Sequence, residues 1–132
     1  MPVTYVIDAT KQLVRTVCAR PLTFAEVLQH FRQLSDDPAC AGHLDVLLDL
    51  TDADSVPETN QLGAVGVAVN ALRKKVTFGA CGIVAASDVM FGMMRIFEVK
   101  AEGYFAAIRV FRKIADAEAW LLLQSSPPEA EP

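Results

Sequence analysis

The sequence is poor in the residues that build disulfide frameworks and metal sites. Its three cysteines, Cys18, Cys40 and Cys81, stand far apart and form no Cys-x-x-Cys pair. We therefore expect neither disulfides nor structural zinc, and we expect thiols in apolar runs to act as small hydrophobic side chains. The two histidines, His30 and His43, have no clustered partner ligands, and we expect both to be solvated.

The common signatures of catalysis and nucleotide binding are also missing. The sequence contains no G-x-G-x-x-G, P-loop, H-E-x-x-H or G-x-S-x-G pattern. We therefore expect no catalytic residue, no cofactor and no bound metal, and we do not expect an enzyme. The 12 Lys and Arg residues against 16 Asp and Glu residues give a net charge of −4, which disfavours nucleic acid as a partner.

Long apolar runs and a targeting segment are absent as well. No run approaches the ~18 apolar residues that a membrane span needs. The first residues, Met1–Val6, show no basic segment followed by an apolar core, so no signal peptide is expected. We predict a cytoplasmic protein without a membrane span.

What the sequence does contain is enough apolar material for one core. Hydrophobic residues make up 52% of its 132 residues, which excludes disorder for most of the chain. We expect one domain over residues 1–124 and a disordered tail over residues 125–132, which are rich in Pro and Glu.

Five segments have the pattern of strands. Val3, Tyr5 and Ile7 alternate with more polar residues, as in a half-buried strand. A second β-rich run, Lys11–Arg20, follows a short link and predicts a hairpin. The runs Leu44–Thr51 and Phe78–Ala86 are nearly all apolar, which is typical of strands covered on both faces. A fifth strand is predicted at 106–111.

Four helices are expected between and after these strands. The first begins after Thr23, which has capping-box spacing to Glu26, and it ends before Pro38. The second spans 57–75, and the third starts at Ser87 or Asp88 and ends at Gly103. The last is predicted to be capped by Asp116.

The order β-β-α-β-α-β-α-β-α predicts an α/β fold. Alternating strands and helices imply right-handed crossovers. We therefore predict a mixed, mostly parallel five-stranded sheet with four helices, whose first strand is antiparallel at one side.

This order and three local patterns resemble the STAS domains of anti-sigma-factor antagonists. The residues that carry the resemblance are the strand Val46–Leu50, the helix segment Phe91–Arg95 and the closing strand and helix Val110–Leu121. They are similar to the small stand-alone bacterial group described as SpoIIAA-like or STAS/SEC14-like. The resemblance implies a small regulatory or ligand-binding domain without enzymatic activity.

In that family a serine at the start of the second helix is phosphorylated, usually within Asp-Ser-Ser-Gly. The corresponding segment here is Asp54-Ser55-Val56-Pro57, which agrees at its first two positions. The resemblance thus makes Ser55 a candidate phospho-switch. The alternative is that Ser55 only marks the entry to the helix.

Three groups of residues are candidates for a partner or ligand surface. The first is the strand end Asp49, Thr51 and Ser55, because open α/β sheets bind ligands beyond the carboxyl ends of their strands; the alternative is that Asp49 caps backbone amides. The second is the helical strip Thr59, Gly63, Gly66 and Asn70, whose two glycines cost about 2 kcal/mol of helix propensity. Its alternative is a solvent face, with Leu62, Val65, Val69 and Leu72 holding the helix in place. The third group is Phe91, Met94 and Arg95 on the third helix.

The sequence leaves two functions open. The first is a non-catalytic regulatory domain that binds a protein partner, which includes a second copy of this chain. The second is a carrier or sensor of a small apolar, lipid-like ligand held between the second and third helices, where methionines offer a pliable apolar surface.

Overall fold

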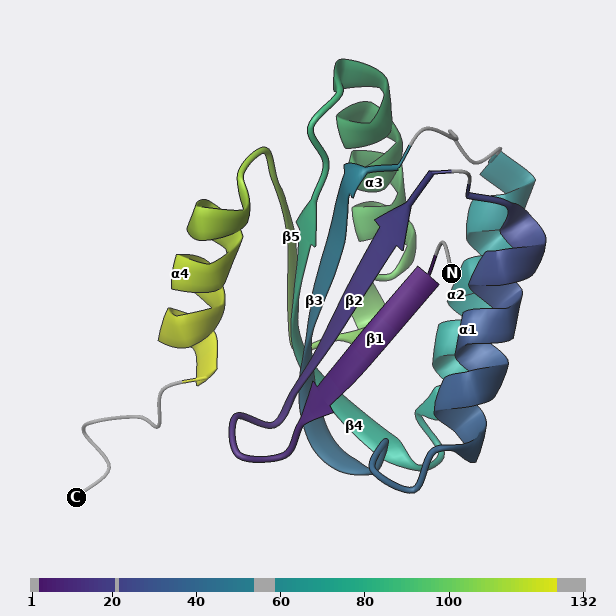
Figure 1. The fold of residues 1–132 in the computed structure, drawn as a ribbon, viewed down its shortest axis with the longest axis vertical. Coiled ribbons are helices and arrows are strands. Elements are labelled where there is room, and N and C mark those ends of the chain that lie inside the picture. Colours follow the sequence, from purple (N-terminus) through teal and green to yellow (C-terminus); the bar gives the residue numbers. More distant parts are fainter. Residues whose placement is uncertain (1–2, 21, 54–58, 126–132) are drawn as a thin grey trace.

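Five strands form one sheet in which each strand lies beside its neighbours in sequence (Figure 1). The structure, a computed structural model, describes residues 3–20, 22–53 and 59–125. Its elements are β1 (Val3–Asp8), β2 (Leu13–Ala19), α1 (Phe24–Asp36), β3 (Gly42–Asp52), α2 (Thr59–Leu72), β4 (Val76–Val84), α3 (Asp88–Lys100), the 3-10 turn η1 (Glu102–Tyr104), β5 (Ala107–Phe111) and α4 (Ile114–Ser125).

The sheet is mixed and mostly parallel, as predicted. β1 pairs with β2 in antiparallel orientation, and β2, β3, β4 and β5 pair in parallel. Right-handed crossovers that all step in one direction place every connecting helix on the same face. Accordingly α1, α2 and α3 cover one face, and α4, which follows the last strand, covers the other (Figure 1).

The strands in the middle of the sheet contribute to a core on each face. On β3, Leu44 and Leu50 belong to the core under α1, α2 and α3, whereas Leu47 packs with Ala117 and Leu121 of α4. This confirms that the apolar run of β3 is covered on both sides. On the edge strand β1, Val3 is buried and Val6 is 66% exposed, which confirms the half-buried pattern.

Helix α1 is fixed at both ends. At its start, the Thr23 side chain accepts a hydrogen bond from the backbone N–H of Glu26 at 3.2 Å, as the capping pattern predicts. At its end, Lys75 Nζ donates to the carbonyl oxygens of Leu34, Ser35 and Asp37 at 3.4, 2.8 and 3.1 Å. Leu34 O and Asp37 O also accept hydrogen bonds from Asp37 N and Cys40 N, so the cation from a distant segment adds to the bonds at a helix end where carbonyls lack their full set of donors.

Several predicted helix ends are wrong by a few residues. The second helix ends at Leu72 rather than 75, and α3 ends at Lys100, so that Gly103 lies in η1. The last helix starts at Ile114, and Asp116 lies in its first turn instead of capping it. The helix also includes Ser125, the first residue of the predicted tail; residues 126–132 lie outside the described part of the chain.

A bulge between β3 and β4 leaves no room for a side chain at position 79. The pairing shifts so that one residue of β3, Asp45, faces two residues of β4, Gly79 and Ala80. The buried Asp45 carboxylate accepts a hydrogen bond from Ala80 N at 2.9 Å. A Cβ at Gly79 would collide with Asp45 Oδ1 and would lie 2.8 Å from His43 Nε2.

We expect Gly79→Ala to lower the free energy of unfolding by about 1–3 kcal/mol, because the added methyl group displaces the buried carboxylate. The matched control is Gly63→Ala, since a Cβ at Gly63 meets nothing within 4 Å. That exposed helical site should gain about 1 kcal/mol from the higher helix propensity of alanine. Urea unfolding of both variants measures the difference, and equal effects at the two sites would contradict this account of the bulge.

Candidate functional site

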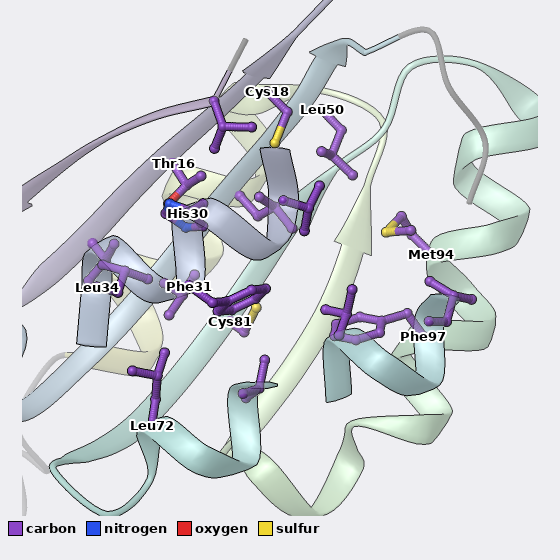
Figure 2. Close-up of a pocket in the computed structure, with 18 of the residues that line it drawn as sticks. Thr16, Cys18, His30, Phe31, Leu34, Leu50, Leu72, Cys81, Met94 and Phe97 are labelled. Carbon is purple, nitrogen blue, oxygen red and sulfur yellow. Dashed lines mark hydrogen bonds between the residues drawn. The ribbon is translucent and has the colours of Figure 1, made fainter. Parts of the chain in front are cut away.

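A cavity of about 180 Å³ lies between the sheet and the three helices α1, α2 and α3 (Figure 2). Helix α1 contributes Phe31 and Leu34, and helix α3 contributes Met94 and Phe97. Helix α2 contributes mainly apolar side chains, Leu62, Val65, Val69 and Leu72, together with Gln61. The cavity therefore lies against α1 as well as between α2 and α3.

The floor of the cavity is formed by side chains of the sheet. Val14, Thr16 and Cys18 of β2 point to the helix side, and Val46 of β3 and Cys81 of β4 continue the same surface. Larger side chains of the sheet, Leu48, Leu50 and Phe78, also line the cavity.

All three cysteines line this cavity, and all three are buried and unpaired. Burial raises the pKa of the Cys18 thiol to about 12, with a smaller contribution from the negative charge of Asp49. Burial also raises the pKa of Cys40 and of Cys81. The thiols are therefore neutral at physiological pH and behave as apolar lining groups, since the thiolate is the nucleophilic form.

His30 also lines the cavity, and the prediction that it is solvated is wrong. The residue is 8% exposed, its Nε2 lies 3.4 Å from Thr16 Oγ1, and its Nδ1 is buried without a hydrogen-bond partner. The ring packs against Tyr5 at a centroid distance of 5.3 Å. His30 lies three residues after Val27 and four before Leu34, both lining residues, so the helical period already places it on the inner face.

Gly63, Gly66 and Asn70 of the predicted helical strip are not among the described residues that line the cavity. A Cβ at Gly66 would lie 3.4 Å from the Tyr104 ring, and Asn70 is exposed and accepts a hydrogen bond from Arg73. Gly63 is exposed with open space around it. Thr59 is the first residue of α2, and its side chain lies outside the described part of the structure. The apolar face of α2 turns to the cavity instead.

The third predicted group is divided between the cavity and the surface. Met94 lines the cavity. Phe91 is half-buried, and the Arg112 guanidinium lies 4.2 Å from its ring centroid. Arg95 forms an exposed ion pair with Glu98 at 3.3 Å. The Phe91 ring is thus already partly covered by a cation from the chain itself.

At the strand end, Asp49 caps the backbone. Its Oδ1 accepts a hydrogen bond from Thr51 N at 2.9 Å, and Thr51 is exposed. This agrees with the capping alternative for Asp49. Ser55 lies outside the described residues. Within residues 3–20, 22–53 and 59–125, no three His, Cys, Asp or Glu side chains are placed to hold a metal ion, and no helix is both long and apolar enough to cross a bilayer.

Burial lowers the pKa of His30 to about 4, against about 6.5 in an unfolded chain. The unfolded state therefore takes up a proton at a higher pH than the folded state does. Stability is complete above pH ~6.5 and falls as the pH drops toward 4, by about 2–3 kcal/mol at pH ~4.5. His30→Leu should lack this component. Urea unfolding of the wild type and of His30→Leu at pH ~6.5 and pH ~4.5 measures this loss of stability. An identical pH dependence of the two proteins would contradict a neutral buried imidazole.

Comparison with known proteins finds no similar family or structure. No protein-family model matches the chain, and neither a curated protein nor a solved structure is significantly similar to it. The resemblance to STAS domains accordingly stays a prediction.

Proposed function

We propose that this protein is a non-enzymatic binding module that encloses one small apolar ligand between its sheet and helices α1, α2 and α3, as a carrier or a sensor. The observation that carries the proposal is the cavity of about 180 Å³. An engineered apolar cavity of about 150 Å³ stays dry and binds benzene. A cavity of this size therefore suits a small aromatic or a short alkyl chain.

Energetics support an occupied cavity. A ligand that covers the apolar lining removes it from water, which is favourable by about 25 cal/mol for each Å² of apolar surface. Natural domains have only about 5–15 kcal/mol of net stability. A ligand that fills the space restores much of the lost packing, so binding and stability are coupled.

Toluene is a suitable probe, and two valines of α2 provide a matched pair of variants. Val65 lines the cavity, whereas Val67 is 69% exposed. At about ten times its Kd, toluene should stabilise the wild type by about 1.4 kcal/mol. Val65→Phe occupies part of the cavity and should lose most of this effect, and Val67→Phe should keep it.

Denaturant unfolding with and without toluene, together with ligand-observed NMR, gives the answer. Absence of toluene binding to the wild type would overturn the proposal. Equal binding to Val65→Phe would show that toluene binds elsewhere, which also overturns it.

A second candidate is the regulatory, STAS-like interaction module, and the outer face of α3 favours it. Val89, Ile96 and Val99 form an exposed apolar stripe, at 61%, 41% and 71% exposure. The opposite face of the same helix lines the cavity through Met90, Met94 and Phe97. A helix with both faces apolar is suited to bind a protein partner outside and a ligand inside.

A second copy of the chain is the partner that can be tested directly. We expect the wild type to self-associate with increasing concentration in sedimentation experiments, and Ile96→Asp to remain monomeric because a charge replaces an apolar contact. Val67→Asp, on the exposed side of α2, is the control and should behave as the wild type. A wild-type protein that stays monomeric at all concentrations would contradict self-association through this stripe.

A further inference from the structure

One polar atom in the cavity lacks a partner. His30 Nδ1 is buried and makes no hydrogen bond within the described structure, although its residue lines the cavity. Buried polar groups are nearly always satisfied, and an exception calls for a specific explanation. The ring of His30 borders an apolar cavity, so a ligand group becomes the partner of Nδ1 once the side chains that cover this atom make way.

The other ring nitrogen limits what that group can be. His30 Nε2 lies 3.4 Å from Thr16 Oγ1, and Thr16 is itself 2% exposed. A neutral imidazole has one N–H and one lone pair, and the threonine hydroxyl can either donate or accept. If Nε2 donates to Thr16, Nδ1 is left as an acceptor; if Nε2 accepts, Nδ1 is left as a donor. A hydroxyl group on the ligand matches both states.

The rest of the lining excludes a charged ligand group. No Asp, Glu, Lys or Arg is among the described residues that line the cavity. The cysteine thiols are neutral because burial raises their pKa values, and burial keeps His30 neutral by lowering its pKa to about 4. An ionised carboxylate or amine would be desolvated there without a counter-charge, which is strongly unfavourable.

We propose that the ligand is an apolar molecule with a single neutral hydroxyl group, an alcohol or a phenol, which forms a hydrogen bond with Nδ1 of His30. This inference rests on the proposed function, because it names the polar part of the ligand held in the same cavity. Thr16 acts as a positioning residue, since its hydroxyl bonds to Nε2 of His30. The hydroxyl donates when Nε2 carries no proton and accepts when it does.

Toluene and p-cresol test the inference, because p-cresol is toluene with one hydroxyl added. We expect the wild type to bind p-cresol about 3- to 10-fold more tightly than toluene, the gain of one net hydrogen bond. In His30→Leu the order should reverse, since the hydroxyl is then buried without a partner. Thr16→Val should retain a preference for p-cresol, because Nδ1 is still present.

Imidazole nitrogen chemical shifts give a second readout that does not depend on a variant folding. Binding of p-cresol to the wild type should shift the Nδ1 resonance of His30, and binding of toluene should not. Benzoate at neutral pH is the charged probe and should bind more weakly than p-cresol.

The outcomes separate the two proposals. If neither toluene nor p-cresol binds, the proposed function fails and this inference fails with it. If toluene binds but p-cresol binds no more tightly, or if benzoate binds most tightly, the hydroxyl inference alone is overturned. A p-cresol preference that persists in His30→Leu also overturns it, because another group must then bind the hydroxyl.

Discussion

The C-terminal end of α1 depends on one interaction with a distant segment, the hydrogen bonds that Lys75 Nζ donates to the carbonyl oxygens of Leu34, Ser35 and Asp37. At the other end Thr23, the residue directly before the helix, caps its first turn. Below it the sheet presents short side chains such as Thr16 and Cys18. Beside larger side chains such as Leu48 and Phe78, these residues border the cavity that lies between the helix and the sheet.

The two faces of the sheet are packed differently. Under α4, Leu47 and Val84 are fully buried against Ala117 and Leu121. The opposite face contains the cavity, where neutral thiols, the imidazole of His30 and the polar side chains of Thr16, Thr23 and Gln61 lie among aliphatic and aromatic groups. A mostly apolar lining with a few polar groups is the usual composition of a small-molecule site.

The sequence predicted the fold class and the order of the elements well, because these follow from local periodicity and from the handedness of crossovers. The site was less predictable. Met94 was among the candidate residues and does line the cavity. The sequence predicts a solvated His30 because histidine is polar, although the helical period places this residue on the same face as Val27 and Leu34. The alternation of β2 places Thr16 on the same face as Val14 and Cys18, but the depth to which Thr16 is buried cannot be read from a strand pattern.

The sequence by itself determined which segments become strands and helices, because alternation and capping residues act over short distances. That three helices share one face of the sheet follows from the strand order, which the tertiary structure decided. Only the tertiary structure decided that the side chains of the sheet and of α1, α2 and α3 leave a cavity between them, and that His30 Nδ1 has no hydrogen-bond partner among the described residues. Both the volume of the cavity and the hydrogen bonding of His30 depend on which side chains surround them, and those side chains come from strands and helices far apart in the chain.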